Sequence, residues 1–183
     1  MEGEYMVGML IAEDIMKFLY SESAKSENLE WEPEWTFSTI VTGRMKMKWW
    51  YEELGFPEYD KVVGLAVRNL IKMKENLIKE IYDEFLDMFV LTGTDFASHA
   101  LSASPIFFPE GYNNGRFLGY CAMVMGVALR YLSLPPSDIP RTACGVVSHV
   151  LFSHLLTGQF YEKGAWLGLY STSKNFNECV ADN

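Results

Sequence analysis

Hydrophobic residues recur at steps of three and four along most of the chain, and this spacing predicts α-helices. Residues 4–20 form the first amphipathic segment, with Glu13 and Lys17 placed as an i,i+4 ion pair on its polar side. Residues 60–89 form the second, and the polar run 74–76 divides it into two helices or one bent helix. Because no stretch alternates polar and apolar residues, the pattern predicts an all-α protein.

Two neighbouring segments, about 112–133 and 138–157, are the most apolar parts of the chain. The first carries no charge from Phe117 to Leu129 and has apolar residues on every side, which predicts a buried central helix. A membrane span needs about twenty such residues, and this run is shorter. A short Pro-containing connection joins the two segments, so we predict an antiparallel hairpin at the centre of a bundle of about seven to eight helices.

Capping residues and prolines predict the remaining helix boundaries. Asp60 is the expected N-cap of the segment 60–89, and Thr94 or Asp95 is the expected N-cap of a helix over 96–108. Pro105 should kink or end that helix. The Pro at position 140 fits the first turn of the helix 138–157, with Ser137 or Asp138 as its cap, and a short last helix is expected at 165–172.

Two parts of this single domain, residues 1–183, are predicted to lie outside the bundle. Residues 21–60 form a linker or insert that starts with the polar stretch 21–28, and four of the five tryptophans fall within 31–59. These aromatic residues either lie against the domain as a loop or form the surface of a homodimer or another partner. Residues 173–183 read as a polar tail.

Composition excludes several functional classes. The net charge of -9 argues against nucleic acid or an anionic membrane as the main partner. The acidic N-terminus and the polar C-terminus predict neither a secretory signal nor a tail anchor. The three cysteines at 121, 144 and 179 lack a CxxC pair, and two of them lie in apolar runs, so reduced thiols are expected.

No motif for catalysis, a metal or a cofactor stands out. His149 and His154 are five residues apart and face different sides of a helix, and no carboxylate pair completes a metal site with them. Ser148 or Ser153 with His149 and Asp138 resembles a triad only on paper, without a nucleophile elbow or an oxyanion hole. We therefore expect no catalytic residue, no metal and no cofactor, and a helical enzyme using His149 or His154 is the weakest alternative.

Arg116 is the exception in the apolar central segment. A guanidinium at the edge of an apolar helix needs a partner or access to water. It either reaches solvent at the helix end, or it lies at the floor of a groove and receives a carboxylate from another molecule. Composition by itself favours the first of these two readings. Residues 113–116, Asn-Asn-Gly-Arg, are followed by a helix of small and apolar residues.

That segment resembles the first homology motif of the Bcl-2 family, which typically reads Asn-Trp-Gly-Arg. Residues 158–166, which include Gly164 and Trp166, resemble the second homology motif at a similar separation. The order of predicted helices is also similar over nearly the whole chain. This sequence departs from the family pattern at Asn114, which replaces the usual Trp, and at 158–159, where Gly-Gln replaces Pro-Trp.

The resemblance implies an anti-apoptotic protein that sequesters pro-apoptotic helices and so blocks mitochondrial apoptosis. Residues 61–77 contain no Leu-xxx-Gly-Asp, so the chain's own third motif (BH3) is degenerate, which is typical of a protein that receives such helices. The implied partners are host BH3-containing proteins of the Bim, Bak and Bax type. The divergent motifs are most similar to viral homologues, which implies a location in the host cytoplasm or at the surface of mitochondria. The alternative within the family is a pro-apoptotic pore former.

A hydrophobic surface groove would bind the partner helix. Met73, Leu77, Ile81 and Phe85 would form one wall, and Phe107, Leu118 and Met123 would form the floor and the other wall. The resemblance assigns Asn113, Gly115 and Arg116 to the first motif and Gly164 and Trp166 to the second, and Gly119 is expected to contact the ligand. Gly115 and Gly119 would let the ligand backbone approach, and Arg116 would pair with an Asp of the ligand. The alternative for each wall residue is a place in the core.

Overall fold

The computed structural model describes residues 2–27, 59–134 and 138–182. These residues form eight α-helices and one 3₁₀ helix without any strand, which confirms the predicted all-α bundle. The elements are α1 (Glu2–Glu27), α3 (Tyr59–Met73), α4 (Glu75–Asp87), α5 (Gly93–Phe107), α6 (Asn114–Arg130), η2 (Tyr131–Ser133), α7 (Ile139–Leu156), α8 (Gln159–Glu162) and α9 (Ala165–Ala181). The predictions for the Trp-rich segment fall on residues 28–58, outside the described part of the chain.

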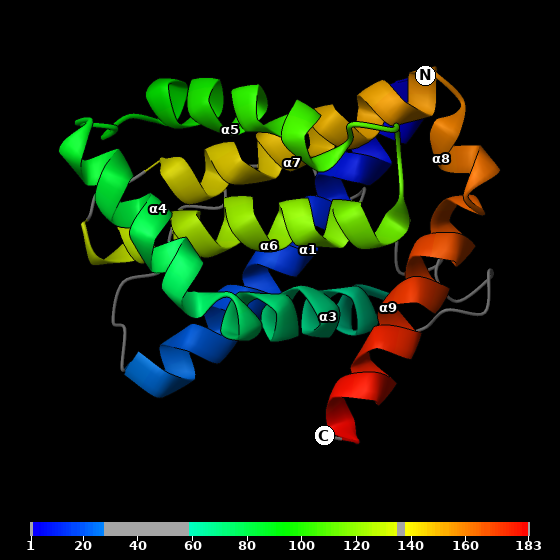
Figure 1. Cartoon of the computed structure of the whole chain (residues 1–183), viewed down its shortest axis with the longest axis horizontal. Helices are drawn as coiled ribbons and strands as arrows, with labels where there is room; N and C mark the ends of the chain where they lie inside the picture. The colour runs from blue at the N-terminus through cyan, green and yellow to red at the C-terminus, as the bar shows by residue number, and fades with distance from the viewer. Residues whose placement is uncertain (1, 28–58, 135–137, 183) are drawn as a thin grey trace.

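Helix α6 lies in the middle of the bundle and contacts α3, α4, α5, α7 and α9 (Figure 1). Eleven of its 17 residues are buried, as expected for a helix that is apolar on every side. α7 packs against it in the antiparallel direction, so the predicted central hairpin is confirmed. Pro140 lies in the first turn of α7, as predicted. Among the described residues, none of the helices combines the length and the hydropathy that crossing a membrane requires.

The first helix is longer and more buried than its sequence suggests. α1 continues to Glu27, so the prediction of a polar linker from 21 onwards is wrong for residues 21–27. It packs against α7 and α3, and Ile15 and Met16 are buried in these contacts. The Glu13–Lys17 ion pair forms at 2.9 Å, but the Glu13 carboxylate is buried in the bundle and does not face solvent.

The helix breaks around α4 follow local chemistry. Lys74 separates α3 from α4, so the segment 60–89 forms two helices, and α3 begins at Tyr59, one residue before the expected cap. Thr92, not Thr94 or Asp95, is the N-cap of α5: its hydroxyl oxygen accepts a hydrogen bond from the Asp95 amide at 3.2 Å. That hydroxyl also donates to the Asp95 carboxylate at 2.7 Å, and this second bond orients the capping side chain. α5 ends two residues after Pro105.

The C-terminal segment is the largest difference from the predicted fold. The pattern predicted a helix at 165–172 followed by a polar tail, whereas α9 runs to Ala181 and packs against α3 and α6. Its polar residues bind α3 directly. The Asn177 amide donates to the Val62 carbonyl at 2.9 Å and accepts from the Asn69 amide at 3.1 Å. Ser173 is fully buried and donates to the Leu169 carbonyl, so its hydroxyl is satisfied inside the helix.

Candidate functional site

The described helices leave a groove of about 470 Å³ between α3, α4, α5 and α6. α4 forms one wall with Leu77, Ile81 and Phe85, which repeat every four residues on one face of the helix. α5 forms the opposite wall, and α6 contributes the floor where Gly119 and Met123 are only partly covered. The lining is apolar apart from a few side chains, which is the usual character of a site that binds an apolar ligand surface.

Six of the predicted wall and floor residues line the groove. They are Leu77, Ile81, Phe85, Phe107, Gly119 and Met123. The structure places two others elsewhere. Leu118 is 2% exposed and belongs to the core, because it points away from the open face of α6. Met73 is 61% exposed at the end of α3, outside the groove lining.

Several other residues line the groove but were not predicted from the sequence to do so. They are Leu70, Lys74, Ile78, His99, Ala100, Ala103, Ile106 and Ala122. A helical signal does mark part of this set: His99, Ala103 and Ile106 are four and three residues apart and therefore share a face of α5. The alanines gave no signal because small apolar residues occur equally on core and surface faces. His99 packs against the ring of Phe85 with centroids 5.2 Å apart, which joins the two walls.

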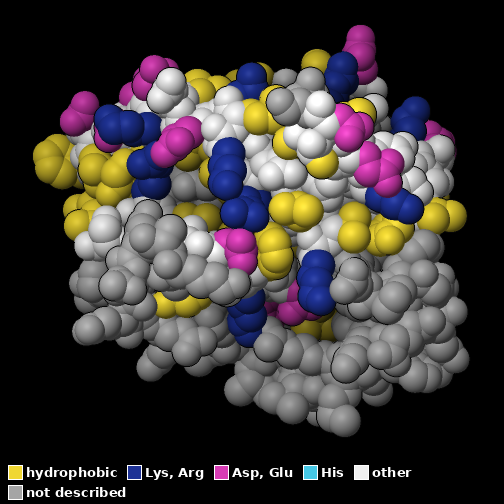
Figure 2. All heavy atoms as spheres, turned by 90° about the horizontal axis from the view of Figure 1, so that it is seen from below, with side chains coloured by type: hydrophobic (Ala, Val, Ile, Leu, Met, Phe, Trp, Pro, Cys, Tyr) yellow, Lys and Arg dark blue, Asp and Glu magenta, His cyan; other side chains and the backbone are white. Residues whose placement is uncertain are grey.

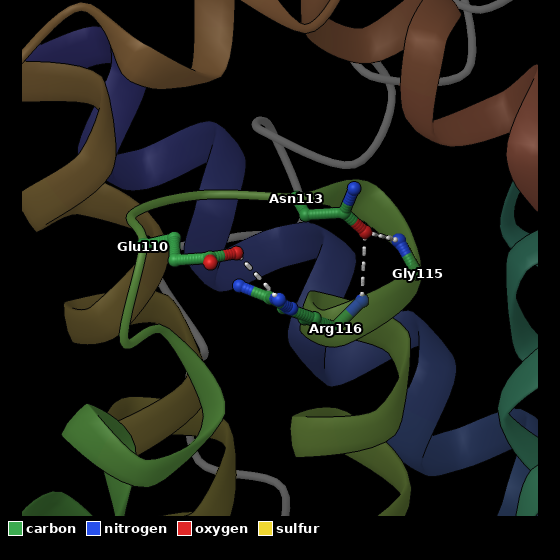
Figure 3. Close-up of polar contacts among 4 residues, drawn as sticks. All are labelled: Glu110, Asn113, Gly115 and Arg116. Atoms are coloured by element: carbon green, nitrogen blue, oxygen red, sulfur yellow. Dashed lines mark hydrogen bonds and ion pairs between the residues drawn. The ribbon is translucent and has the colours of Figure 1, made fainter.

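The N-terminus of α6 is built by Asn113. Its side-chain oxygen accepts hydrogen bonds from the amides of Gly115 at 2.9 Å and Arg116 at 3.2 Å, which satisfies two donors that the helix cannot pair itself (Figure 3). Asn113 therefore has a structural role as N-cap of the helix that carries Arg116. A side chain at Gly115 would meet the Asn113 oxygen at 3.3 Å, so glycine also suits the cap.

The Arg116 side chain points to the loop before α6, where its guanidinium forms an ion pair with the Glu110 carboxylate at 3.0 Å (Figure 3). Arg116 is 40% and Glu110 is 80% exposed, so the pair lies in water and contributes only about 0–1 kcal/mol. Arg116, Gly119 and Met123 are at steps of three and four and share one face of α6. The guanidinium thus belongs to a residue one turn beyond the apolar groove, outside its lining.

The second motif-like segment contacts the start of α6. The Tyr112 amide donates to the Gln159 side chain at 3.0 Å, and the Asn114 side chain donates to the Lys163 carbonyl at 3.0 Å. Gly164, the N-cap of α9, has φ of 86°, a conformation that favours glycine. Trp166 packs edge-to-face on Phe160 with centroids 4.8 Å apart. The residues that depart from the family pattern, Asn114 and Gln159, therefore join the two segments.

The histidines of α7 do not lie together in a catalytic arrangement. His149 is exposed, while His154 packs against Phe108 and Tyr112 and its ring Nδ1 lies 3.1 Å from the Gln159 oxygen. Burial lowers the pKa of His154, and the Gln159 contact opposes this shift. Within residues 2–27, 59–134 and 138–182 there is no group of three potential metal ligands.

The cysteines behave as the sequence predicts. Cys121 and Cys144 are buried and unpaired with each other, and Cys179 is exposed. Burial raises the pKa of both the Cys121 and the Cys144 thiol, so these side chains are neutral and unreactive parts of the core. The thiol of Cys144 donates to the Pro140 carbonyl within its own helix.

Comparison with known proteins adds no family to this geometry. No protein-family model matches the sequence, and neither the curated proteins nor the solved structures give a match.

Proposed function

We propose that the chain binds an amphipathic helix of another protein in the groove between α3, α4, α5 and α6. The observation that carries the proposal is the combination of an apolar groove of about 470 Å³ with a partly exposed arginine one turn further along the same face of α6. A helix lying in such a groove presents apolar anchors at i, i+3 or i+4, and i+7. Each anchor buried there contributes about 1.5–3 kcal/mol.

Arg116 selects ligands that carry an acid beside their apolar face. The Glu110 pair is solvent-exposed and weak, so a ligand carboxylate can take its place or share the guanidinium, which has five donors. Once the docked helix excludes water, the new contact is charge-assisted and stronger than the exposed pair that it replaces. The apolar anchors provide most of the affinity, and the acid provides specificity.

At the level of the cell, the proposed function is that of an anti-apoptotic, Bcl-2-like regulator that sequesters pro-apoptotic BH3 helices. Three features of the chain support this proposal: the resemblance of residues 113–116 and 158–166 to the first two homology motifs, the direct contact between these two segments, and the position of Arg116 beside the groove. The absence of a Leu-xxx-Gly-Asp sequence from 61–77 supports the role of receiver.

Calorimetric titration with a panel of BH3 peptides tests the binding proposal. We expect Arg116→Ala to weaken the tightest peptide by more than tenfold, because a stranded ligand carboxylate costs more than about 1.4 kcal/mol. Arg141→Ala removes the same charge from the exposed start of α7 and should leave the affinity unchanged. Peptides whose Asp is replaced by Asn should show little difference between the wild type and Arg116→Ala. A loss below tenfold removes Arg116 from the central role.

A second experiment tests the direction of the cellular effect. The full chain is added to isolated mitochondria treated with a pro-apoptotic peptide, and release of intermembrane proteins is measured. The proposal expects protection by the wild type and loss of protection by Arg116→Ala. Leakage of liposomes by the chain alone, without an activating peptide, supports a pore former instead and contradicts the anti-apoptotic assignment.

A further inference from the structure

A second cavity, of about 460 Å³, lies at the other end of α6. The end of α1, the α3–α4 corner, the last turn of α6 and η2 surround it, and we name it the η2 pocket. The buried side chain of Ile78 borders both the η2 pocket and the groove, so α4 crosses α6 between the two cavities. Unlike the groove, the η2 pocket combines apolar and charged walls.

The apolar part of the η2 pocket comes from four aliphatic residues, one each from α3, α4, α6 and η2: Ile71, Ile78, Leu129 and Leu132. Ile78 and Leu132 are buried, while Ile71 and Leu129 are partly covered by their neighbours and still reach the cavity. Water in contact with these side chains is unfavourable, and an aliphatic chain that displaces it gains free energy in proportion to the area covered.

The charged lining of the η2 pocket has two cations, Lys72 and Arg130, and one acid, Glu75, so its net charge is positive. A smaller adjoining cavity of about 210 Å³ shares Lys72 and adds the pair Arg68 and Glu22. The contact between the Arg130 guanidinium and the Glu75 carboxylate is long, at 3.8 Å, and Glu75 is largely exposed, so this contact is weak. Arg68 pairs with Glu22 at 3.2 Å. Three cations and two acids thus meet in a chain whose net charge is -9.

This distribution of charge is consistent with the surface around α3. Figure 2 shows the face below the bundle, where Lys and Arg side chains lie among hydrophobic and acidic side chains. A ligand of this region must therefore contact cations and cover aliphatic surface. Nucleotides and sugars leave the aliphatic walls uncovered, and a neutral hydrocarbon offers no charge to Lys72 or to Arg130, whose contact with Glu75 is long.

We propose that the η2 pocket binds a single-chain anionic amphiphile, such as a fatty acid, with its head group on Lys72 and Arg130 and its chain over Ile71, Ile78, Leu129 and Leu132. The head group receives charge-assisted hydrogen bonds from an ammonium and a guanidinium, which are stronger than bonds between neutral groups. A cavity of about 460 Å³ lies within the usual size range of small-molecule sites. The site is independent of helix binding in the groove.

Titration of the full chain with decanoate, below its micelle-forming concentration, tests this proposal. We expect decanoate to bind with amide shifts in NMR spectra centred on Gly126, Leu129 and Leu132. Octanoate should bind more weakly, by about fourfold for each CH₂ removed. Decyltrimethylammonium, which has the same chain and the opposite charge, should bind far more weakly than decanoate. Decanol, with the same chain and no charge, separates the contribution of the chain from that of the head group.

Charge variants locate the head group. Lys72→Gln and Arg130→Gln should each weaken decanoate binding by about fivefold, as expected for a partly exposed ion pair. Lys174→Gln removes the same charge from the exposed side of α9 and should leave the affinity unchanged. Lys74→Gln, which changes a cation of the groove, should also have no effect.

Three results overturn the proposal: the absence of decanoate binding, equal binding of the cationic amphiphile, and amide shifts confined to Gly119 and Met123 with no dependence on Lys72 or Arg130. The last result assigns the fatty chain to the groove. The NMR mapping uses the wild-type chain and so does not depend on how the variants fold.

Discussion

Gly119 and Gly126 lie two turns apart on the same face of α6, but their surroundings differ completely. A side-chain carbon at Gly119 would meet only the edge of Phe107, at an ordinary contact distance of 3.8 Å, because Gly119 opens onto the groove. The same carbon at Gly126 would lie 2.9 Å from Ile78 and 3.2 Å from Ile71. One end of the α6 face is left open, and the other is covered by the chain's own α3–α4 corner.

The two arginines of α6 extend this comparison. Arg116 lies beyond the open end of the face and Arg130 beyond the covered end, and both are partly exposed next to a glutamate. The open end has an apolar groove of about 470 Å³, whereas the covered end has the η2 pocket, of about 460 Å³, with apolar and charged walls. The helices that cross α6, rather than the composition of α6 itself, therefore decide which kind of cavity lies at each end.

Removing the wall between the two cavities has the largest expected effect. Ile78 is 2% exposed, and Ile78→Ala deletes buried methyl groups and leaves a cavity that joins the groove to the η2 pocket. We expect the free energy of unfolding to fall by about 2–4 kcal/mol, measured by urea denaturation. Leu77→Ala, its neighbour on the exposed rim of the groove, should cost less than about 1 kcal/mol. If Ile78→Ala and Leu77→Ala lower the free energy of unfolding equally, Ile78 is not the packed wall between the groove and the η2 pocket.

Gly119→Ala and Gly126→Ala test the same contrast by adding a methyl group instead of removing buried ones. Gly126→Ala must push back two branched, packed isoleucines, and we expect a net loss of about 1–2 kcal/mol even after the gain in helix propensity. Gly119→Ala meets no such obstacle and should be neutral or stabilising by up to about 1 kcal/mol. Thermal unfolding of both variants measures the difference. If Gly126→Ala is as stable as the wild type, Ile71 and Ile78 can move aside at little cost, and the packing between the two cavities is loose.

Much of this fold follows from residue spacing. The central hairpin, the break at Lys74 and the burial of α6 were predictable because long apolar segments bracketed by Pro, Gly and Asn have few other packing solutions. The extent of α9 was not predictable, because its last turns are mostly polar: Phe176 packs against the core, and Asn177 reaches the Val62 carbonyl of α3. Tertiary hydrogen bonds of this kind leave no periodic signal in the sequence. The same holds for α1, which continues through a polar stretch.

The groove was predictable in part, for a related reason. The α4 residues Leu77, Ile81 and Phe85 follow a strict helical period, and the structure places all three on one wall. Leu118 follows the same apolar pattern but faces the core, since a helix that is apolar on every side does not show which side is open. The partner of Arg116 was also missed. Glu110 lies in a loop, where no periodicity relates the acid to the helix.

Filling the open end should affect ligand binding and leave folding unchanged. Gly119→Leu projects a branched side chain into the groove floor, where the described structure leaves space. We expect BH3-peptide affinity to fall by about tenfold or more, because the ligand backbone can no longer approach α6. Gly119→Ala is the matched control and should lose only a little peptide affinity. The unfolding midpoint of both variants checks that the fold is intact. Unchanged peptide affinity in Gly119→Leu places the ligand away from this face.

The smallest effect concerns Glu110, which competes with any ligand acid for Arg116. Glu110→Gln keeps a hydrogen-bond acceptor at the guanidinium but removes the charge, so the free energy of unfolding should change by less than about 0.5 kcal/mol. The affinity for an Asp-bearing peptide should increase by about two- to fivefold at low salt, and the gain should shrink at high salt. Glu178→Gln, an exposed acid of α9, separates this local effect from the change in net charge.

The salt series, together with Glu110→Gln measured in the wild type and in the Arg116→Ala background, decides between two roles of Glu110. If Glu110 only competes, its removal tightens peptide binding and the effect depends on Arg116, so it vanishes in the Arg116→Ala background. If Glu110 instead orients the guanidinium towards the groove, its removal weakens binding, because Arg116 must then pay the entropy of ordering a long side chain during docking. The exposure of both side chains favours competition, since an exposed pair is too weak to hold Arg116 in one orientation.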